Sequence, residues 1–329
     1  MYSLSSKEKL HFWVQKHIWG VQANVALLPL ANLYCGVMRI RRHAYQQGWL
    51  HSERLPVPVL VVGNITVGGA GKTPLVLWLA NFLETNGWKP GILSRGYGGK
   101  IGNEPKEVFL EDDPKEVGDE PLLLARRSKL PVAVCTKRTA AGNLLISRHG
   151  CTCLICDDGL QHYALARDIE IVVTDRVRGF GNGHCLPAGP LREAISRMAK
   201  THLRVAHGPP AFGEHMMSLE LGVAVSIDPA KVLRPLSEFQ TTPIHAVAGI
   251  GHPDRFFNAL RAKGLNIIPH PLPDHFAFQK KDFDFGDRFP VVMTEKDAVK
   301  CHFLPEGWYV PAEAILPSEF GKKLLDLLP

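Results

Sequence analysis

The segment from residue 59 to residue 74, VLVVGNITVGGAGKTP, constrains the fold more than any other part of the chain. A Val-rich apolar run leads into a glycine-rich turn, and an apolar helical pattern begins at Lys72 and Thr73. This order of strand, loop and helix is typical of a P-loop, in which backbone N–H groups and the helix dipole hold phosphate oxygens. The segment therefore predicts a buried strand that carries a nucleotide-binding loop at its end.

The loop departs from the common P-loop pattern at one position. The pattern G-x-x-x-x-G-K-[ST] has glycine where this chain has Thr66. We expect Lys72 to reach the β- and γ-phosphates and Thr73 to bind Mg²⁺. The backbone around the phosphates of ATP is expected to come from Gly68, Gly69, Ala70 and Gly71. The alternative for this segment is a glycine-rich turn before an ordinary helix.

The chain beyond Pro56 alternates strand-like and helix-like runs. Strands are predicted at 57–63, 90–94, 131–135, 152–156 and 169–174, and helices at 72–86, 119–128, 137–149 and from Arg192. A second such unit begins near residue 244, with strands at 244–248, 265–269 and 290–294 and helices at 254–263 and 295–302. This alternation predicts α/β folds with a parallel sheet, helices on both faces and ligands at the carboxyl ends of the strands.

Four regions follow from these patterns. We expect residues 1–50 to form an amphipathic helical segment at the membrane interface. The other expected regions are a P-loop ATP-binding domain at 51–215, a β linker at 216–235 and a smaller C-terminal α/β domain at 236–329. The 329 residues are 45% hydrophobic and 21% charged, which fits a globular protein with a full core. The net charge of +6 suits a polyanionic ligand or an anionic membrane surface, and the absence of a Lys/Arg block gives no indication of nucleic acid.

The N-terminal segment suggests contact with a membrane. Residues 18–38 carry no formal charge and are mostly apolar, and three arginines follow, Arg39, Arg41 and Arg42. Polar residues and a proline interrupt the run, and Trp13, Trp19 and Tyr34 lie in or near it. We expect one or two helices at the membrane interface, with the arginines near anionic head groups. A spanning helix and a plain core helix are the alternatives.

Two consecutive carboxylates follow the strand predicted at 152–156. Asp157 and Asp158 end an apolar strand downstream of the P-loop, which is the arrangement of a Walker B motif that supports Mg²⁺. The sequence Asp-Asp-Gly is also a good turn, and this is the alternative. The nearby cysteines of C-x-C-x-x-C, at 151, 153 and 156, sit in the strand pattern and are interpreted as core residues.

Other polar residues occupy positions where a phosphoryl acceptor could be activated. Asp119 begins a helix, where it is either an N-terminal cap or a carboxylate that accepts a proton. Arg138 begins another helix, and a cation there indicates an anionic ligand nearby. His275 lies in a turn of the second unit and could act with Asp119 if the two units close over a cleft. A turn histidine without such a role is the alternative.

Several motifs together resemble the tetraacyldisaccharide 4′-kinase family. They are GNITVGGAGKTP, SRGYG, GDEP, DDGLQH, LPAGPLRE, AGIGHPDRFF, PDHF and TEKDAVK, in this order along the chain. The resemblance implies two α/β/α domains joined by a β linker, with the active site between them. It also implies a peripheral enzyme on the cytoplasmic face of the bacterial inner membrane. Such a kinase transfers the γ-phosphate of ATP to the 4′-hydroxyl of an acylated glucosamine disaccharide 1-phosphate, which gives lipid IVA in lipid A biosynthesis.

The resemblance also assigns roles to residues. Asp119 becomes the general base, working with His275, while Lys72 holds phosphate. The ATP site gains Arg138 and Arg192, and the Mg²⁺ ligands become Thr73, Asp157, Asp158 and Glu193. Arg95 and Tyr97 are expected to contact the lipid substrate. Thr66 is the usual residue of this family at its position.

Three other functions would require sequence features that can be compared with this chain. A membrane-associated ATPase acting as a nucleotide switch would carry lysine at the position of Val67. A GTPase would carry Asn-Lys-x-Asp, whereas residues 294–297 read Thr-Glu-Lys-Asp. A non-catalytic lipid-binding protein would not need Lys72 and Thr73. The sequence therefore favours the lipid kinase, with the nucleotide switch as the alternative.

Overall fold

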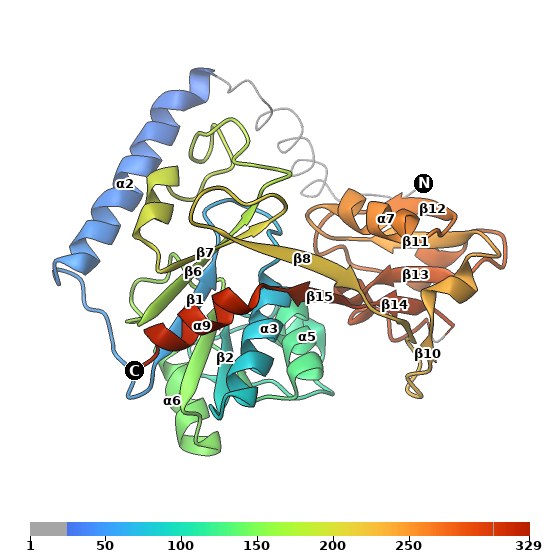
Figure 1. The fold of residues 1–329 in the computed structure, drawn as a ribbon, viewed down its shortest axis with the longest axis horizontal. Coiled ribbons are helices and arrows are strands. Elements are labelled where there is room, and N and C mark those ends of the chain that lie inside the picture. Colours follow the sequence, from blue (N-terminus) through green and yellow to red (C-terminus); the bar gives the residue numbers. More distant parts are fainter. Residues whose placement is uncertain (1–24, 305) are drawn as a thin grey trace.

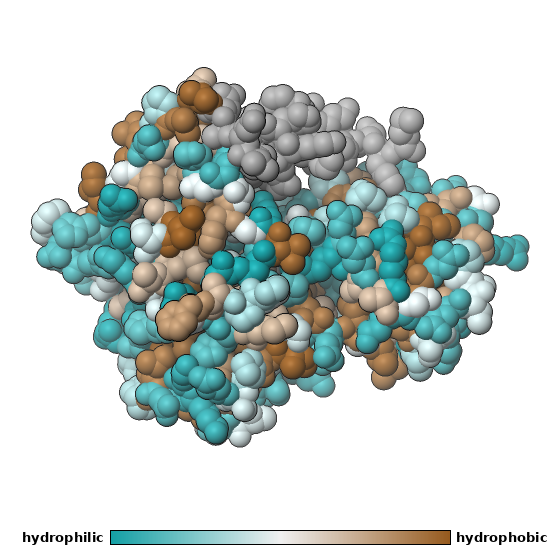
Figure 2. All heavy atoms as spheres, turned by 45° about the horizontal axis from the view of Figure 1, so that its top comes forward, coloured by the Kyte–Doolittle hydropathy of each residue, from teal (hydrophilic) through white to brown (hydrophobic). Residues whose placement is uncertain are grey.

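The chain forms two α/β units that lie next to each other, with a long helix along the outer side of the first (Figure 1). The computed structural model describes residues 25–304 and 306–329. Helix α2 (Leu28–Gln46) lies along the left side of Figure 1, and brown side chains line the matching upper left edge of the surface in Figure 2. This arrangement confirms the predicted architecture of a P-loop domain, a smaller α/β domain and an N-terminal helix.

The first unit is built on a nine-stranded sheet in the order β15-β8-β7-β6-β1-β5-β2-β4-β3. The strands from β8 to β4 run parallel, and the two edge strands are antiparallel to their neighbours. Their bounds are β1 Val59–Gly63, β2 Pro90–Ser94, β3 Lys106–Glu107, β4 Val132–Val134, β5 Cys153–Asp157, β6 Ile169–Asp175, β7 Leu203–His207, β8 His215–Leu221 and β15 Ala312–Ile315. The P-loop strand β1 lies between β5 and β6, in the middle of the parallel part.

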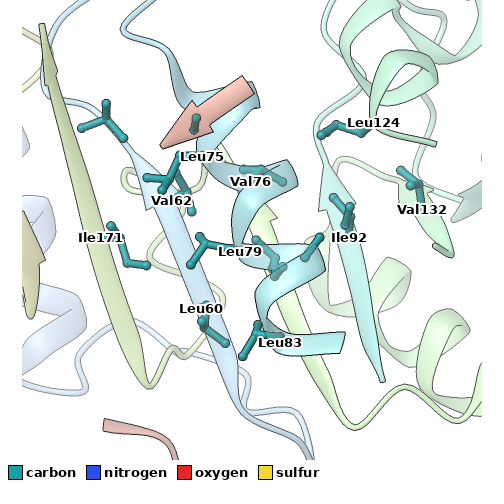
Figure 3. Packing of buried hydrophobic residues seen from close by; sticks show 14 of the residues in the cluster. Leu60, Val62, Leu75, Val76, Leu79, Leu83, Ile92, Leu124, Val132 and Ile171 are labelled. Carbon is teal, nitrogen blue, oxygen red and sulfur yellow. The ribbon is translucent and has the colours of Figure 1, made fainter. Parts of the chain in front are cut away.

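Helices cover both faces of this sheet, as the sequence predicts. They are α3 Lys72–Thr85, α4 Pro114–Val117, α5 Asp119–Ser128, α6 Arg138–His149 and α9 Ser318–Leu327. Leu60 and Val62 of β1 pack under Leu79 of α3 on one face (Figure 3). The alternate residues Val59 and Val61 face the other side, in a second apolar cluster that includes Ala141 and Leu145 of α6. A central parallel strand is therefore apolar on both faces, which explains its continuous Val/Leu run.

The region after Gly189 differs from the sequence prediction. A helix was expected from Arg192, but the chain stays in a loop there, and a short 3₁₀ helix, η2, runs over Ile195–Lys200. The backbone N–H of Arg192 donates to the carbonyl of Ile65, 2.7 Å away, and the N–H of Val67 donates to the carbonyl of Pro190, 2.9 Å away. The loop pairs with the P-loop instead of coiling, because these tertiary hydrogen bonds replace those of a first helical turn.

The second unit carries a six-stranded sheet in the order β10-β9-β14-β13-β11-β12. Its strands are β9 Ala224–Ser226, β10 Leu233–Arg234, β11 Ile244–Ala248, β12 Ile267–Pro271, β13 Val291–Thr294 and β14 Trp308–Val310. Its helices are α7 Pro253–Ala262 and α8 Glu295–Ala298, with short 3₁₀ turns η3 Leu236–Phe239 and η4 Lys280–Phe283. Strands β14, β13, β11 and β12 are parallel, and Phe257 and Leu260 of α7 are buried in the core.

The chain crosses between the units twice. It leaves the first sheet through β8, and it returns through β15, which pairs antiparallel with β8. Helix α9 then packs on the first unit, where Phe320 is fully buried and its ring lies 5.4 Å from that of Trp78. Residues 312–327 therefore lie with the first sheet, although the sequence pattern grouped them with the second unit. The two β crossings form the link between the units (Figure 1).

Helix α2 is amphipathic and follows the short 3₁₀ turn η1 (Val25–Leu27). Ala31 is buried, and Tyr34 and Cys35 pack against the core on the α6 side of the first sheet. The opposite face exposes a row of large apolar side chains, namely Leu30, Leu33, Val37 and Ile40. Among the described residues, no helix has the length and apolarity needed to cross a membrane. The beginning of the predicted apolar segment, with Trp13 and Trp19, lies outside the described residues.

Candidate active site

The P-loop follows β1 and is held in shape by a buried asparagine. Asn64 is fully buried, and its Nδ2 donates to the Thr66 Oγ1 and to the Gly68 carbonyl, each 3.3 Å away. Lys72 Nζ lies 3.5 Å from Asn64 Oδ1. Gly71 precedes α3 with a φ of 84°, a left-handed conformation that favours glycine. Thr66 therefore serves the loop as a hydrogen-bond acceptor, which glycine could not do.

Asp158 lies between two cations at the edge of this loop. Arg192 Nη1 is 3.0 Å from both carboxylate oxygens, and Lys72 Nζ is 3.5 Å from Oδ1. Burial would raise the pKa of Asp158, but the Lys72 and Arg192 charges outweigh it and lower the pKa to about 2. Asp158 is therefore ionised at neutral pH and positions the two cations that face the phosphate-binding loop.

Its neighbour Asp157, the last residue of β5, lies in surroundings that disfavour its ionised form. The side chain is 2% exposed, and Oδ1 has no hydrogen-bond partner within the described part of the chain. Burial, reinforced by the negative charge of Glu120, raises the pKa of Asp157 to about 7. A buried carboxylate oxygen without a partner is a suitable ligand for a divalent cation, which would favour its ionised form.

A carboxylate and an imidazole from different units meet beside this region. Asp119 is the first residue of α5, and its Oδ2 is 3.0 Å from Nδ1 of His275. Asp119 Oδ1 accepts the N–H of Glu120 at 3.0 Å. Burial would raise the pKa of Asp119, but the His275 hydrogen bond and the positive charges of Lys296 and Lys300 lower it to about 2. The pair thus holds an anion ready to accept a proton.

His275 is fixed on the loop between β12 and β13. Its φ is 61°, in the left-handed region that non-glycine residues rarely adopt. The Tyr97 ring lies 4.9 Å from the imidazole ring, so the loop after β2 also reaches this point. Non-glycine residues in this conformation are found most often where the surrounding structure holds them for a function.

Charged contacts close the seam between the two units around this pair. Lys296 Nζ of α8 is 2.8 Å from Glu120 Oε1 and 3.1 Å from Asp274 Oδ1. Arg127 of α5 pairs with Glu295 of α8 at 2.7 Å. Sequence reasoning assigned these residues no role, although Glu120 lies in the motif GDEP, Asp274 in PDHF, and Glu295 and Lys296 in TEKDAVK.

A cavity of about 310 Å³ lies between the P-loop and the second unit. Residues 69–73 form one side, while Glu120, Asp274 and Lys296 line it from the seam. Much of the remaining wall is apolar and includes Leu77, Leu219, Leu221, Ile250, Phe256 and Val310. Gly251 approaches Gly69 so closely that a Cβ at Gly251 would lie 2.8 Å from the Gly69 nitrogen. The cavity therefore combines phosphate-binding backbone with an apolar wall, as a nucleotide requires.

Comparison with known proteins agrees with this geometry. The family model for tetraacyldisaccharide-1-P 4′-kinase matches residues 23–329. This chain belongs to the tetraacyldisaccharide 4′-kinase family. It is 53% identical to the tetraacyldisaccharide 4′-kinase of Nitrosococcus oceani over 92% of this chain and 90% of that protein. It is 51% identical to that of Alkalilimnicola ehrlichii, over 92% of this chain and 91% of the relative.

A solved structure of the same family shares the fold. It is the "apo" form of LpxK from Aquifex aeolicus in complex with ATP. The TM-score is 0.78 at 26% sequence identity, over 92% of this chain and 99% of the other. The two-unit architecture is therefore common to members of the tetraacyldisaccharide 4′-kinase family that differ widely in sequence.

Two of the residues predicted for the phosphate and Mg²⁺ sites make hydrogen bonds within the first unit. Arg138 is 2% exposed and donates to the Cys135 carbonyl at 2.8 Å, and its charge favours the ionised form of Asp157. Glu193 is 3% exposed, and its oxygens accept hydrogen bonds from Gln161 at 3.0 Å and Tyr163 at 2.6 Å. In this structure both side chains are used within the first unit.

The remaining predicted residues lie around the mouth of the site. Arg95 and Tyr97 follow β2 and are exposed, and Tyr97 contacts His275 as described above. The structure thus brings Lys72, Asp157 and Asp158 together at one edge of the sheet and joins Asp119 to His275 across the seam. In the described part of the chain, no three His, Cys, Asp or Glu side chains converge to hold a metal ion by themselves. A metal in this site would need further ligands from nucleotide and water.

Proposed function

We propose that the protein is an ATP-dependent lipid kinase that phosphorylates the 4′-hydroxyl of a tetraacylated glucosamine disaccharide 1-phosphate. One observation carries the proposal, beyond family membership. The Asp119–His275 pair and the P-loop residue Lys72 belong to one region at the same seam between the two units. A nucleotide switch needs a phosphate-binding loop but no proton acceptor for a second substrate. The pairing of both features therefore favours phosphoryl transfer to an alcohol.

ATP is expected to enter the cavity with its phosphates on the P-loop. The backbone N–H groups of residues 68–71 and the N-terminus of α3 face the phosphates in this proposal, and Lys72 neutralises the transferred group. Arg192, which also pairs with Asp158, supplies a second positive charge near Lys72. The apolar wall suits the flat face of an adenine ring.

Magnesium fits two of the predicted protein ligands. Thr73 begins α3 beside Lys72, and the unpartnered Oδ1 of Asp157 supplies a carboxylate oxygen. Mg²⁺ is commonly held by one or two protein oxygens together with phosphates and water, so a larger protein cage is unnecessary. When bound, the ion supplies positive charge that stabilises the phosphates during transfer.

Asp119 is proposed as the general base. It is ionised, and it would take the proton of the acceptor hydroxyl as that oxygen bonds to the γ-phosphorus, while the bond to ADP breaks. His275 holds the carboxylate through the 3.0 Å hydrogen bond. This role needs Asp119 from the first unit and His275 from the second, so catalysis depends on their contact.

The lipid acceptor is proposed to arrive from a membrane surface. Helix α2 exposes Leu33 and Ile40 at 63% and 68% on one face, and Arg39 is exposed beside Ile40. Arg41 and Arg42 are half-buried and contact Gln161 and Glu193 of the first unit. Figure 2 shows brown side chains along this edge. Arg95 and Tyr97, which are exposed beside His275, are proposed to contact the sugar or phosphate of the lipid. The protein would then work as a peripheral enzyme on the cytoplasmic face of the inner membrane.

A direct assay tests this function. Purified protein, ATP labelled at the γ-phosphate, Mg²⁺ and the acylated disaccharide 1-phosphate should give a labelled lipid. The same lipid already phosphorylated at the 4′ position should give none, which identifies the reacting hydroxyl. ATP hydrolysis that is independent of the lipid, with no labelled lipid, would contradict the proposal and favour the nucleotide switch.

A further inference from the structure

Lys296 lies in the seam between the two units, and the reaction proposed for Asp119 and His275 gives it no role. It is the second residue of α8, and its side chain is 15% exposed. Its ammonium lies 2.8 Å from Glu120 Oε1, 3.1 Å from Asp274 Oδ1 and 3.4 Å from His275 Nε2. An ammonium has three hydrogens to donate, so these three contacts, one to the first unit and two to the second, use its full donor capacity.

The contact with His275 constrains the proton on the imidazole ring. An ammonium can donate but cannot accept, so the ring nitrogen that faces Lys296 must be unprotonated. At the other side of the ring, an ionised Asp119 can accept but cannot donate, so Nδ1 must carry the proton. The two contacts independently require the same neutral tautomer, with hydrogen on Nδ1.

The charged form of the ring fits these contacts poorly. A protonated His275 would place a cationic N–H 3.4 Å from the Lys296 ammonium. Asp274 Oδ1, the carboxylate near the same nitrogen, is further away at 3.8 Å and already accepts from Lys296. Like charges at this spacing repel each other, so Lys296 disfavours the imidazolium.

Helix α8 is held rigidly enough to place Lys296. Thr294 caps the helix, and the fully buried Asp297 accepts from the Thr294 hydroxyl at 2.6 Å and from the Gly249 N–H at 2.8 Å. Lys300 pairs with Asp297 at 3.1 Å. These contacts fix the short helix against the loop after β11 and thereby fix the position of Lys296.

We propose that Lys296 is a positioning residue that holds His275 as the neutral Nδ1–H tautomer, so that His275 donates to Asp119 and Asp119 accepts the proton of the acceptor. This inference rests on the proposed kinase function for its kinetic consequence. The tautomer itself does not depend on that function. His275 then orients and stabilises the carboxylate and does not receive the proton at Nε2.

The experiment uses the full chain with ¹⁵N-labelled histidine. Long-range ¹H–¹⁵N spectra report which ring nitrogen carries hydrogen, and a His275→Gln variant assigns the signal. Wild-type protein is expected to show a protonated Nδ1 and a bare Nε2 at neutral pH. Lys296→Met is expected to let hydrogen occupy Nε2 as well, because Asp119 still requires hydrogen on Nδ1, and to lower kcat about 100-fold with the KM for ATP changed less than about threefold.

A matched control separates positioning from simple loss of the seam. Arg127→Met removes the other ion pair between α5 and α8, at Glu295, without touching His275. It should leave the tautomer unchanged and kcat within about twofold of wild type. If Lys296→Met does not fold, the double variant Lys296→Met/Glu120→Gln removes one positive and one negative charge together, and its tautomer is read instead.

The outcomes are distinct. Hydrogen on both ring nitrogens in the Lys296 variant, and on Nδ1 alone in the Arg127 variant, supports the proposal. A wild-type ring protonated on Nε2, or an Nε2 that stays bare after loss of Lys296, overturns it. Equal losses of kcat in the two variants would also overturn the positioning role. Failure of the lipid phosphorylation assay would contradict the kinase function but would leave the spectroscopic result readable.

Discussion

The two units contribute to the candidate site in different ways. In the first unit, Asp157 and Asp158 lie at the carboxyl end of β5, and Lys72 begins the helix after the neighbouring strand β1, so a single sheet edge gathers the proposed phosphate and metal ligands. The second unit contributes through a loop and a short helix, which supply His275 and Lys296. The proposed phosphate site is therefore a local feature of one sheet, whereas the proposed proton acceptor is completed only where the units touch.

The carboxylates show the same contrast. Asp158 has its pKa lowered by Lys72 and Arg192, which belong to its own unit. Asp119 has its pKa lowered by His275, Lys296 and Lys300, all from the other unit. Separation of the units would leave Asp158 ionised beside its own cations, but it would remove the neighbouring cations from Asp119. The following predictions test this difference, from the largest expected effect to the smallest.

The largest effect is expected for Asp119→Ala. This change removes the proposed base but leaves the phosphate-binding edge intact, so kcat should fall by about 10³-fold with little change in the KM for ATP. Steady-state kinetics with the lipid acceptor measure both values. Asp254→Asn, an exposed carboxylate in the first turn of α7, serves as the control and should behave as wild type. An effect confined to KM would count against Asp119 as the base.

A large effect on membrane binding is expected for the double variant Leu33→Asp/Val37→Asp. Both side chains are more than half exposed on the apolar face of α2, and burying such a side chain in lipid contributes about 1–2 kcal/mol. Partition onto anionic vesicles in a sedimentation assay should fall more than about tenfold. The matched variant Val232→Asp/Leu233→Asp places equal charge on exposed apolar residues of the second unit and should bind normally. Equal partition of all three proteins would exclude α2 as the contact.

The pH dependence of Mg²⁺ binding should follow Asp157. Its pKa of about 7 means that below pH 7 the ion must displace a proton, so the Mg²⁺ affinity of the ATP complex should fall by up to about tenfold per pH unit. Calorimetric titrations between pH 5.5 and 8, roughly the range around that pKa, measure this slope. Asp157→Asn should remove the slope, and Asp158, with a pKa of about 2, should contribute none in this range.

The stability of the ligand-free protein provides a second measurement on Asp157. Because the pKa in the folded state is raised, the group stabilises the fold at low pH, and this contribution is lost as pH rises through about 7. Asp157→Asn should therefore raise Tm at pH 8 relative to wild type more than it does near pH 5, roughly one unit above the ordinary carboxyl pKa. The same Tm difference at both pH values would contradict the buried, protonated state.

The smallest effect is expected for Glu193→Gln. The structure uses this carboxylate to hold Gln161 and Tyr163, so the change should lower the free energy of unfolding by about 1–2 kcal/mol. Denaturant unfolding measures the loss, and the exposed Glu319→Gln is the control. Mg²⁺ affinity should stay within about twofold of wild type, since the side chain is held by protein partners. A tenfold loss of Mg²⁺ affinity would instead make Glu193 a ligand, as the family resemblance implies.

Sequence patterns were most informative where the chemistry is local. The strand–loop–helix segment at 59–85 and the strand that ends at Asp157 were predicted correctly, because a short stretch of chain contains all the necessary signals. Sequence patterns were least informative for segments whose hydrogen-bond partners are distant in the sequence. The helix expected from Arg192 is a loop paired with residues 65 and 67, and the return of residues 312–327 to the first sheet has no local signal.

The sequence by itself determined the P-loop, the central apolar strand, the amphipathic character of α2 and, through several ordered motifs, the family. Each of these depends on the type and spacing of residues that are close along the chain. Only the tertiary structure decided which charges meet. Asp119 and His275 are 156 positions apart, and Lys296 and Glu120 are 176 apart, so their contacts arise from packing one unit against the other. Coulomb energy and hydrogen bonding depend on distance in space, and that distance is set by the whole fold.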